Sequence, residues 1–309
     1  MNVRPRLRQP RAVAATVRGA RGVALILVLW VVVLLTVIAG SFVYAARSSA
    51  LVAGNVVAVA RARALADAGV FRGLYEIARA GNEADAWKAD GRVHVFTLDG
   101  GEVRVVVRDE SAKIDLNTAS DALLEGLLRA AGLDADHAAQ LRDAILDWRD
   151  ADDLARPQGA ERDRYEALGL PYIPANAPFQ SVDELLKVVG MTPDLYRRLA
   201  GALTVHSHQP GITSTLASRQ VLLAIPGAQP EDVDAYLAER EQALAAGQTP
   251  APFLLAKGFE VGAGTQVYNV QSFATAADGT RYAREASARL TADPRQPFQF
   301  LQWQEGSSP

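Results

Sequence analysis

Residues 22–46 read GVALILVLWVVVLLTVIAGSFVYAA, a run of 25 residues without a charged side chain. An α-helix of that length extends about 37 Å, more than the roughly 30 Å hydrocarbon core of a bilayer. We therefore predict a membrane-spanning helix rather than the buried helix of a soluble protein. A cleaved secretory signal is an alternative, with Tyr44–Ala46 as its cleavage site, but the apolar region of such signals usually has only about 7–15 residues.

The residues before this run carry a strong positive charge. Positive charge resists translocation, so this end should stay in the cytoplasm and the body should lie on the far side of the membrane. Of the 32 basic residues 26 remain for the body, against 35 acidic ones, which gives it a net charge of −9 and disfavours nucleic acid as a partner. The chain has no cysteine, which excludes disulfides, thiolate zinc sites and cysteine nucleophiles. The leading arginines, which no acid accompanies, are Arg4, Arg6, Arg8, Arg11, Arg18 and Arg21.

The helical pattern continues beyond the membrane span. Residues 47–80 are rich in helix formers and have an apolar and a polar face, and the next strong helix breaker is Gly81-Asn82. We predict one helix over residues 23–80, about 87 Å long, half in the membrane and half packed on a soluble domain.

Strand patterns stand on both sides of the chain's middle. Asp99–Gly101 and Ala277–Gly279 are turn signals, each between two alternating runs, which predicts two β-hairpins. A final alternating run predicts one more strand. The five predicted strands cover residues 92–98, 102–108, 266–273, 281–290 and 298–303.

The middle itself, residues 113–258, is helical by pattern. Helix-start signals occur at Asn117–Ala119, at Ser181 with Glu184 three residues later, and at Thr192-Pro193. The simplest arrangement is an α+β fold. In it the long N-terminal helix packs on an antiparallel sheet, and a large helical domain is inserted between the strands of that sheet.

Acidic residues concentrate in one loop of this middle region. Counted from Asp150, the loop echoes an EF-hand, but Ala155 stands where that motif needs glycine, so a standard EF-hand is rejected. Two interpretations remain: hard oxygen ligands folded around one Ca²⁺, or a solvated acidic loop balanced by nearby arginines. The candidate ligands are Asp150, Asp152, Asp153, Glu161 and Asp163, with Asn176 as a source of an amide oxygen.

Other motifs carry weaker functional signals. Residues 127–146 and 221–240 are similar to helix-hairpin-helix segments, which bind DNA phosphates in some proteins, but acids occupy both hairpins, so packing is the preferred interpretation. A membrane-anchored DNA-binding protein remains the alternative. His206 and His208 lack a third nearby metal ligand and are interpreted as a surface pair. A membrane-anchored periplasmic hydrolase is a further alternative, for which no G-x-S-x-G motif is present.

The start of the apolar run resembles a prepilin-type leader. Such leaders are cleaved after a glycine, here Gly22, so that the apolar helix is retained and begins at Val23. Pilin-like proteins usually have glutamate at the fifth mature position, where this chain has Leu27. The family that typically lacks it is minor pseudopilin K of type II secretion systems (general secretion pathway protein K), which the body also resembles. The matching segments are KIDLNTA (113–119), DWRDADD (147–153), GAE (159–161), NAPF (176–179) and FLQW (300–303).

The resemblance divides the chain into domains and implies calcium. The helical domain should be of the helix-hairpin-helix or SAM-like type, and the resemblance implies that this domain binds calcium. The expected divisions are a leader over 1–22, a transmembrane and amphipathic helix over 23–80, the inserted helical domain over 113–258, and pilin-like sheet over 81–112 and 259–309.

The resemblance also implies a function, that of a non-enzymatic tip subunit. Prepilin peptidase should remove the leader, and Val23 should then be methylated. The protein should sit in the inner membrane as a single-pass protein with its body in the periplasm. It should cap a fibre of major pseudopilin, in complex with minor pseudopilins I and J, and help to initiate fibre assembly for protein export. In such fibres the fifth-position glutamate pairs with a neighbour's N-terminal amine, because a buried charge is costly without a partner. Leu27 carries no charge and needs no such partner. This suits a subunit at the tip of the fibre, which has no other subunit above it.

Overall fold

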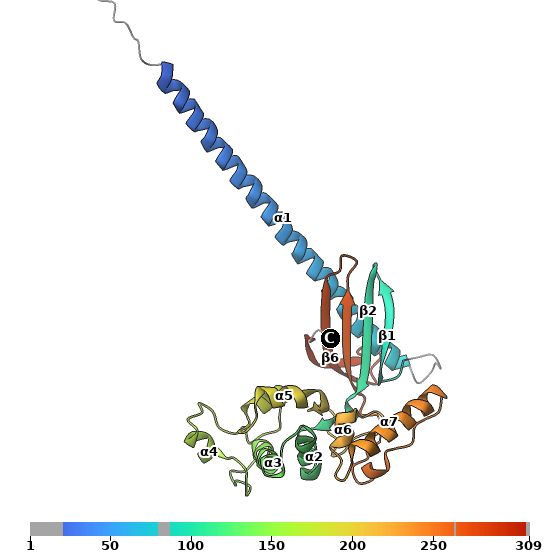
Figure 1. Ribbon diagram of the computed structural model, residues 1–309. Coiled ribbons are helices and arrows are strands. Elements are labelled where there is room, and N and C mark those ends of the chain that lie inside the picture. Colours follow the sequence, from blue (N-terminus) through green and yellow to red (C-terminus); the bar gives the residue numbers. More distant parts are fainter. Residues whose placement is uncertain (1–20, 80–86, 263, 307–309) are drawn as a thin grey trace, which may run out of the picture. The chain divides into compact units, whose positions relative to one another are not determined.

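The computed structural model describes residues 21–79, 87–262 and 264–306. The chain forms two compact units that divide within the first helix, after Ala58. The first unit is the apolar part of that helix, and the second contains the rest of the helix, a sheet and the helical domain (Figure 1). The predicted α+β, pilin-like fold class is confirmed. The predicted leader lies almost entirely outside the described residues.

Helix α1, Arg21–Arg79, is continuous over 59 residues. The apolar side chains from Val23 to Val57 are exposed, as expected of a segment made for a bilayer rather than for a protein core. From Ala62 onward one face is buried, and its residues recur three or four positions apart, which is the helical period. The buried residues on this face are Ala62, Leu65, Ala66, Val70, Leu74 and Ile77.

The sheet has five antiparallel strands in the order β1-β2-β5-β6-β7. The first predicted hairpin is confirmed: Asp99 and Gly100 both adopt positive φ, at 48° and 72°, as a two-residue hairpin turn requires. β2 pairs directly with β5, so the chain leaves the sheet and re-enters it at the neighbouring position. The strands are β1 (Asp90–Leu98), β2 (Gly101–Asp109), β5 (Val267–Thr275), β6 (Arg281–Leu290) and β7 (Phe298–Glu305).

Small residues let α1 lie directly on this sheet. A Cβ on Gly69 would stand 2.1 Å from Ser272 Oγ, and one on Gly73 would press on Val270 and Val105 at 3.1–3.2 Å. The side chains of β2, β5 and β6 that share the core with α1 are small or β-branched, which fits so close an approach. They are Val103, Val105, Val107, Val270, Ala274, Ala286 and Ala288.

The helical domain occupies the chain between β2 and β5. Near its start, β3 (Ile114–Asp115) pairs in parallel with β4 (Leu203–Thr204), which lies between α5 and α6. Its core is a separate cluster centred on leucines of the first two helices. The helices are α2 (Asp121–Ala130), α3 (Ala135–Arg149), α4 (Arg162–Ala167), α5 (Pro193–Leu199), α6 (Arg219–Leu223) and α7 (Pro230–Ala245), with 3₁₀ turns η1 (Glu110–Ala112), η2 (Val182–Lys187), η3 (Ala200–Ala202) and η4 (Leu254–Ala256).

Two of the three predicted helix starts, at Ser181 and Thr192, are confirmed in position, and the one at Asn117–Ala119 is wrong. Thr192 caps α5 by accepting from Leu195 N, with Pro193 in the first turn. At α2, however, the capping side chain is that of Ser120. The Asn117 side chain instead donates to the backbone oxygen of Phe179 and accepts from its backbone nitrogen. Ser181 makes no side-chain capping bond.

A buried ion pair ties α1 to the sheet. The Arg284 side chain on β6 is 4% exposed, and its Nε donates to Asp67 Oδ1 of α1 at 2.7 Å. Its guanidinium also lies 5.1 Å from the ring centroid of Trp303 on β7. The pair therefore joins the helix to the two strands at one edge of the sheet.

Replacing Asp67 by alanine should lower the free energy of unfolding of the body by about 2 kcal/mol, because Arg284 then keeps a buried charge without its carboxylate. Urea unfolding of the full chain in detergent, followed by tryptophan fluorescence, measures this. Arg63→Ala is the control: Arg63 lies 4.0 Å from Asp67 but its side chain is 58% exposed, so its loss should change stability by less than about 0.5 kcal/mol. Equal losses in the two variants would contradict a role for burial.

Candidate functional site

The acidic loop joins two helices of the inserted domain. Asp150 is the C-cap of α3, and Glu161 is the N-cap of α4. The loop therefore begins and ends on carboxylates held by helix termini. Within it Asp152 and Asp153 are exposed, whereas Glu161 is 6% exposed.

Several oxygens of this loop are buried without a hydrogen-bond donor. They are Asp150 Oδ1, both carboxylate oxygens of Glu161, and Asn176 Oδ1. Asn176 adopts a positive φ of 46° and donates its Nδ2 to Asp152 O at 3.0 Å and Asp153 Oδ1 at 2.9 Å. Because the amide nitrogen is occupied by the loop, the amide oxygen is left as an acceptor. Buried acceptors without donors are costly, and a cation would satisfy them.

The electrostatics of the loop point the same way. Burial raises the pKa of Glu161 to about 7, and repulsion from Asp147, Asp150, Asp153 and Asp152 adds to the rise. Burial, followed by the charge of Asp152, also raises the pKa of Asp150. The carboxylates are therefore close enough to repel one another, and the loop holds more negative charge than its surroundings compensate.

Asp147 belongs to this group, although sequence reasoning missed it. It lies on the last turn of α3, fully buried, and accepts from Ala160 N at 2.8 Å and from Arg156 N at 3.3 Å. A Cβ on Gly159 would stand 1.9 Å from Asp147 Oδ2, so only glycine allows the loop to close on this carboxylate. The sequence did contain one indication that Asp147 belongs with the loop acids: it precedes Asp150 by three residues, which is within one helical turn.

Arg156 is the cation nearest to these acids. Its guanidinium lies 3.5 Å from Asp147 Oδ1, 3.9 Å from Asp150 Oδ2 and 3.8 Å from Asp121 Oδ2. Its Nε makes no hydrogen bond. One arginine at these distances balances part of the charge and leaves the orphaned oxygens unsatisfied.

Not every predicted ligand joins the group. Asp163 is exposed on the first turn of α4, and no contact given by the structure connects it to the loop carboxylates. Among the described residues no three His, Asp or Glu side chains form a ready metal cage. Ca²⁺ takes six to eight oxygens and accepts amides, backbone carbonyls and water among them. The buried Glu161 carboxylate, the buried Oδ1 of Asp150 and the buried amide oxygen of Asn176 therefore fit Ca²⁺ by the chemistry of the donors, as a partial ligand set.

The membrane-facing candidates lie at the start of α1. Val23 and Leu27 are exposed along its first turns, 66% and 62%, and Gly22 precedes them in the same helix. Of the helices described, one is long and apolar enough to cross a membrane, and it begins at Val23. Residues 1–20 of the predicted leader lie outside the described residues.

The helix-hairpin-helix segments pack against each other. Gly126 on α2 meets the end of α6 so closely that a Cβ would stand 1.9 Å from Ala224 O. Within the α2–α3 hairpin, Asp134 caps α3 by accepting from His137 N at 2.9 Å. An acid thus holds the backbone donor that a phosphate would need, which fits the packing interpretation.

His206 and His208 do not converge on a shared metal with a third side chain in the described part of the chain. His208 has a φ of 51° and is held through its backbone N, which donates to Asp115 Oδ2 at 2.8 Å. Burial lowers the pKa of His206, which keeps its ring neutral near pH 7. This neutral ring lines a separate cleft and is not part of the acidic loop.

An apolar membrane-length helix whose second half covers one face of an antiparallel sheet defines the class of pilin-like proteins. A family model described as "Type II secretion system (T2SS), protein K" matches residues 103–208. The type II secretion system protein K of Pectobacterium carotovorum is 33% identical over 119 residues, covering 34% of this chain and 36% of its own. That of Pseudomonas aeruginosa is 29% identical over 245 residues, covering 71% and 73%.

The solved structures show the same fold. A chain in the crystal structure of the GspK–GspI–GspJ complex from the enterotoxigenic Escherichia coli type 2 secretion system matches 81% of this chain and 97% of its own, with a TM-score of 0.60 and 17% identity. In sequence over residues 103–208 and in fold over most of its length, the chain is therefore similar to type II secretion system protein K.

Without calcium, the raised pKa of Glu161 should make the free energy of unfolding fall as pH rises from about 4.5 to about 7. Since the folded-state pKa lies above the ordinary value of 4.5, the folded protein binds this proton more tightly, and that stabilisation is lost once pH passes about 7. Urea unfolding in excess chelator across this range measures the slope.

The variant Glu161→Gln should lose this part of the slope. Glu166→Gln, which changes an exposed glutamate of the same helix, is the matched control and should keep it. An unchanged slope in Glu161→Gln would contradict the assignment.

Proposed function

We propose that this protein is a minor pseudopilin that caps the tip of the periplasmic pseudopilus and helps to initiate its assembly for protein export across the outer membrane. The observation that carries the proposal is the large helical domain between β2 and β5 on a pilin-like core, in a chain that is similar to protein K. A subunit with so large an insertion suits a position where no further subunit has to be added above it.

Leu27 supports the same position. A fifth-position acid inside a fibre needs the N-terminal amine of a neighbour, because an unpaired charge in an apolar environment is costly. Leucine at this position needs no such neighbour. The protein can therefore lead a fibre of major pseudopilin without leaving a buried charge unpaired at the top.

The membrane arrangement follows from the charge of the N-terminus. The arginine-rich residues 1–22 remain in the cytoplasm as a leader, α1 crosses the inner membrane once, and the body lies in the periplasm. Prepilin peptidase cleaves between Gly22 and Val23, and Val23 becomes the methylated mature N-terminus. The freed helix then passes from the membrane into the fibre.

The partners proposed are minor pseudopilins I and J. The solved neighbour of this fold is a complex of GspK with GspI and GspJ, and we extend that assembly to this chain. The role is structural rather than enzymatic, and nucleic acid is not a partner because acids occupy the hairpin positions that would hold phosphates.

Calcium is proposed as a structural ion of the helical domain. Asp150, Glu161 and Asn176 would supply ligands through their orphaned oxygens, with Asp152 and Asp153 beside them. When bound, the ion neutralises the excess charge of the loop and fixes the connection from α3 to α4. Asp163 is not included in this set.

The assembly test is coexpression of the full chain with minor pseudopilins I and J of the same secretion system. The protein should copurify with both from solubilised inner membranes, and mass spectrometry should find its N-terminus at methylated Val23. The Gly22→Val variant, which alters the cleavage site, should retain residues 1–22. A mature N-terminus at Met1 or near Ala46, or copurification with neither partner, would overturn the proposal.

The calcium test is thermal unfolding of the full chain in chelator and in rising calcium. Calcium at about 100 times its dissociation constant should add about 2.7 kcal/mol of stability, because it binds the folded state alone. Asp150→Asn and Glu161→Gln should lose most of this stabilisation. Asp163→Asn, the same kind of change at an exposed acid of the same segment, should keep it. Absence of a calcium shift in the unaltered chain would reject the ion and leave the assembly proposal standing.

A further inference from the structure

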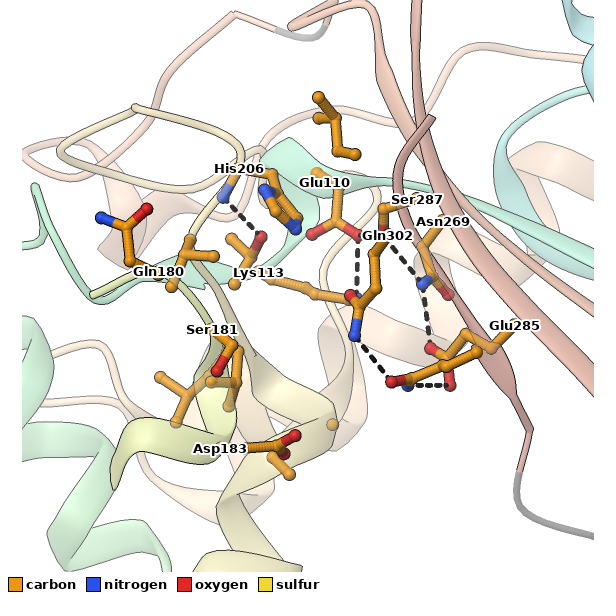
Figure 2. Close-up of a pocket in the computed structure, with 18 of the residues that line it drawn as sticks. Glu110, Lys113, Gln180, Ser181, Asp183, His206, Asn269, Glu285, Ser287 and Gln302 are labelled. Carbon is orange, nitrogen blue, oxygen red and sulfur yellow. Dashed lines mark hydrogen bonds and ion pairs between the residues drawn. The ribbon is translucent and has the colours of Figure 1, made fainter. Parts of the chain in front are cut away.

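A polar cleft of about 570 Å³ lies between the sheet and the helical domain, away from the acidic loop. One wall comes from η1 and from β5, β6 and β7, and the other from η2, α5 and β4. Figure 2 shows the two sets of side chains facing each other, with Asn269, Glu285 and Ser287 on the sheet side and Ser181 and Asp183 opposite.

The sheet wall is a connected hydrogen-bond network. Glu110 Oε1 accepts from Lys113 Nζ at 3.1 Å and from Ser287 Oγ at 3.3 Å. Asn269 Nδ2 donates to Glu285 Oε1 at 2.9 Å and to Ser287 Oγ at 3.3 Å. These bonds join Glu110, Ser287, Asn269 and Glu285 in one network.

Two acceptors in that network remain without a donor. Glu110 is 1% exposed and Asn269 is 3% exposed, yet Glu110 Oε2 and Asn269 Oδ1 make no hydrogen bond. Buried acceptors in this condition call for a donor from outside the network. Both residues line the cleft, and the two oxygens lie beneath its surface.

The charge of the cleft specifies the kind of donor. Three carboxylates line it, from Glu110, Asp183 and Glu285, against the cations Lys113 and Arg197. Lys113 is bound to Glu110, and Arg197 is an exposed side chain paired with Asp194. The cleft therefore has negative charge in excess, and complementarity favours a cation that carries several N–H donors.

The cleft also opens beside an unpaired strand edge. β7 is the last strand of the sheet, and among the described residues its outer edge has no strand beside it. Leu301, Gln302 and Gln304 of this strand line the cleft. An exposed edge offers backbone donors and acceptors to an extended segment of another chain, whose side chains then alternate toward the two faces of the sheet.

We propose that this cleft is a docking site for an extended segment of a partner protein, which pairs with the edge of β7 and inserts an arginine or lysine side chain between Glu285, Glu110 and Asp183. The inserted cation offsets the excess of carboxylates that line the cleft. Arginine fits best, because its planar guanidinium donates to several acceptors at once.

The test uses the full chain in nanodiscs and a labelled peptide, Ac-Thr-Thr-Val-Arg-Val-Thr-Thr-amide, followed by fluorescence anisotropy. A second peptide carries citrulline in place of arginine, which keeps the shape and removes the charge. The arginine peptide should bind about tenfold more tightly than the citrulline peptide, the factor expected when a charge-assisted hydrogen bond is lost.

Variants on both walls should weaken the arginine peptide by about tenfold: Glu285→Gln on the sheet and Asp183→Asn on the helical domain. Glu102→Gln is the matched control, because Glu102 is an exposed glutamate of the same sheet that does not line the cleft. Circular dichroism checks that the variants remain folded.

Four results would overturn the proposal. One is equal binding of the two peptides, which would reduce the cleft to a water-filled space beside a strand edge. A second is an arginine peptide that Glu285→Gln and Asp183→Asn leave unaffected. A third is absence of binding at millimolar peptide. The last is displacement of the peptide by micromolar calcium, which would assign the cleft to a metal ion.

Discussion

Gly69 and Gly73 let α1 lie directly against β2 and β5, and the rest of the body depends on that contact. The helix meets the sheet through a stripe of small and branched residues, so that one face of all the central strands is covered by a single element. The buried Arg284–Asp67 pair then fixes the helix along its own axis, because sliding by one turn would leave the guanidinium without its carboxylate. The second half of this helix is thereby part of a protein core, and its first half is long and apolar enough to cross a membrane.

The position of the insertion follows from strand pairing. Because β2 and β5 are neighbours, the chain leaves the sheet at Asp109 and returns at Val267 to almost the same place. A hydrogen bond of 3.1 Å from Thr265 Oγ1 to Asp109 Oδ1 closes the two ends. A domain attached in this way can be large without disturbing the sheet, since it replaces what would otherwise be a short hairpin loop. It also brings α5 and η2 opposite the sheet face that α1 leaves uncovered.

Local patterns could be predicted from the sequence, and contacts between distant residues could not. The turn at Asp99-Gly100 was recognisable because its chemistry is contained in two residues. Asn117 carried an equally good capping signal, but a partner 62 residues away, Phe179, uses its side chain instead. The acidic loop was recognisable from the sequence, but its buried members were not: Asp147 was hidden in a helical pattern, and Asp163 is exposed on α4. The Arg284–Asp67 pair, whose members are 217 positions apart in the sequence, had no local signal at all.

The loop and the cleft share one physical problem and differ in how it can be solved. Each places carboxylates where burial removes the water that would solvate them, and each leaves acceptor oxygens without donors. At the loop those oxygens lie on the connection between α3 and α4 and on Asn176, which follows α4, so a small ion would join two nearby segments of one domain. In the cleft the two orphaned oxygens lie on the sheet wall, Asp183 faces that wall from the helical domain, and the space between them lies beside a strand edge. A group large enough to span the walls, and attached to a chain that can pair with that edge, satisfies both conditions together, which a bare ion does not. The excess of carboxylates at the loop would therefore favour binding of an ion within the domain, and the excess at the cleft would favour binding of a partner chain.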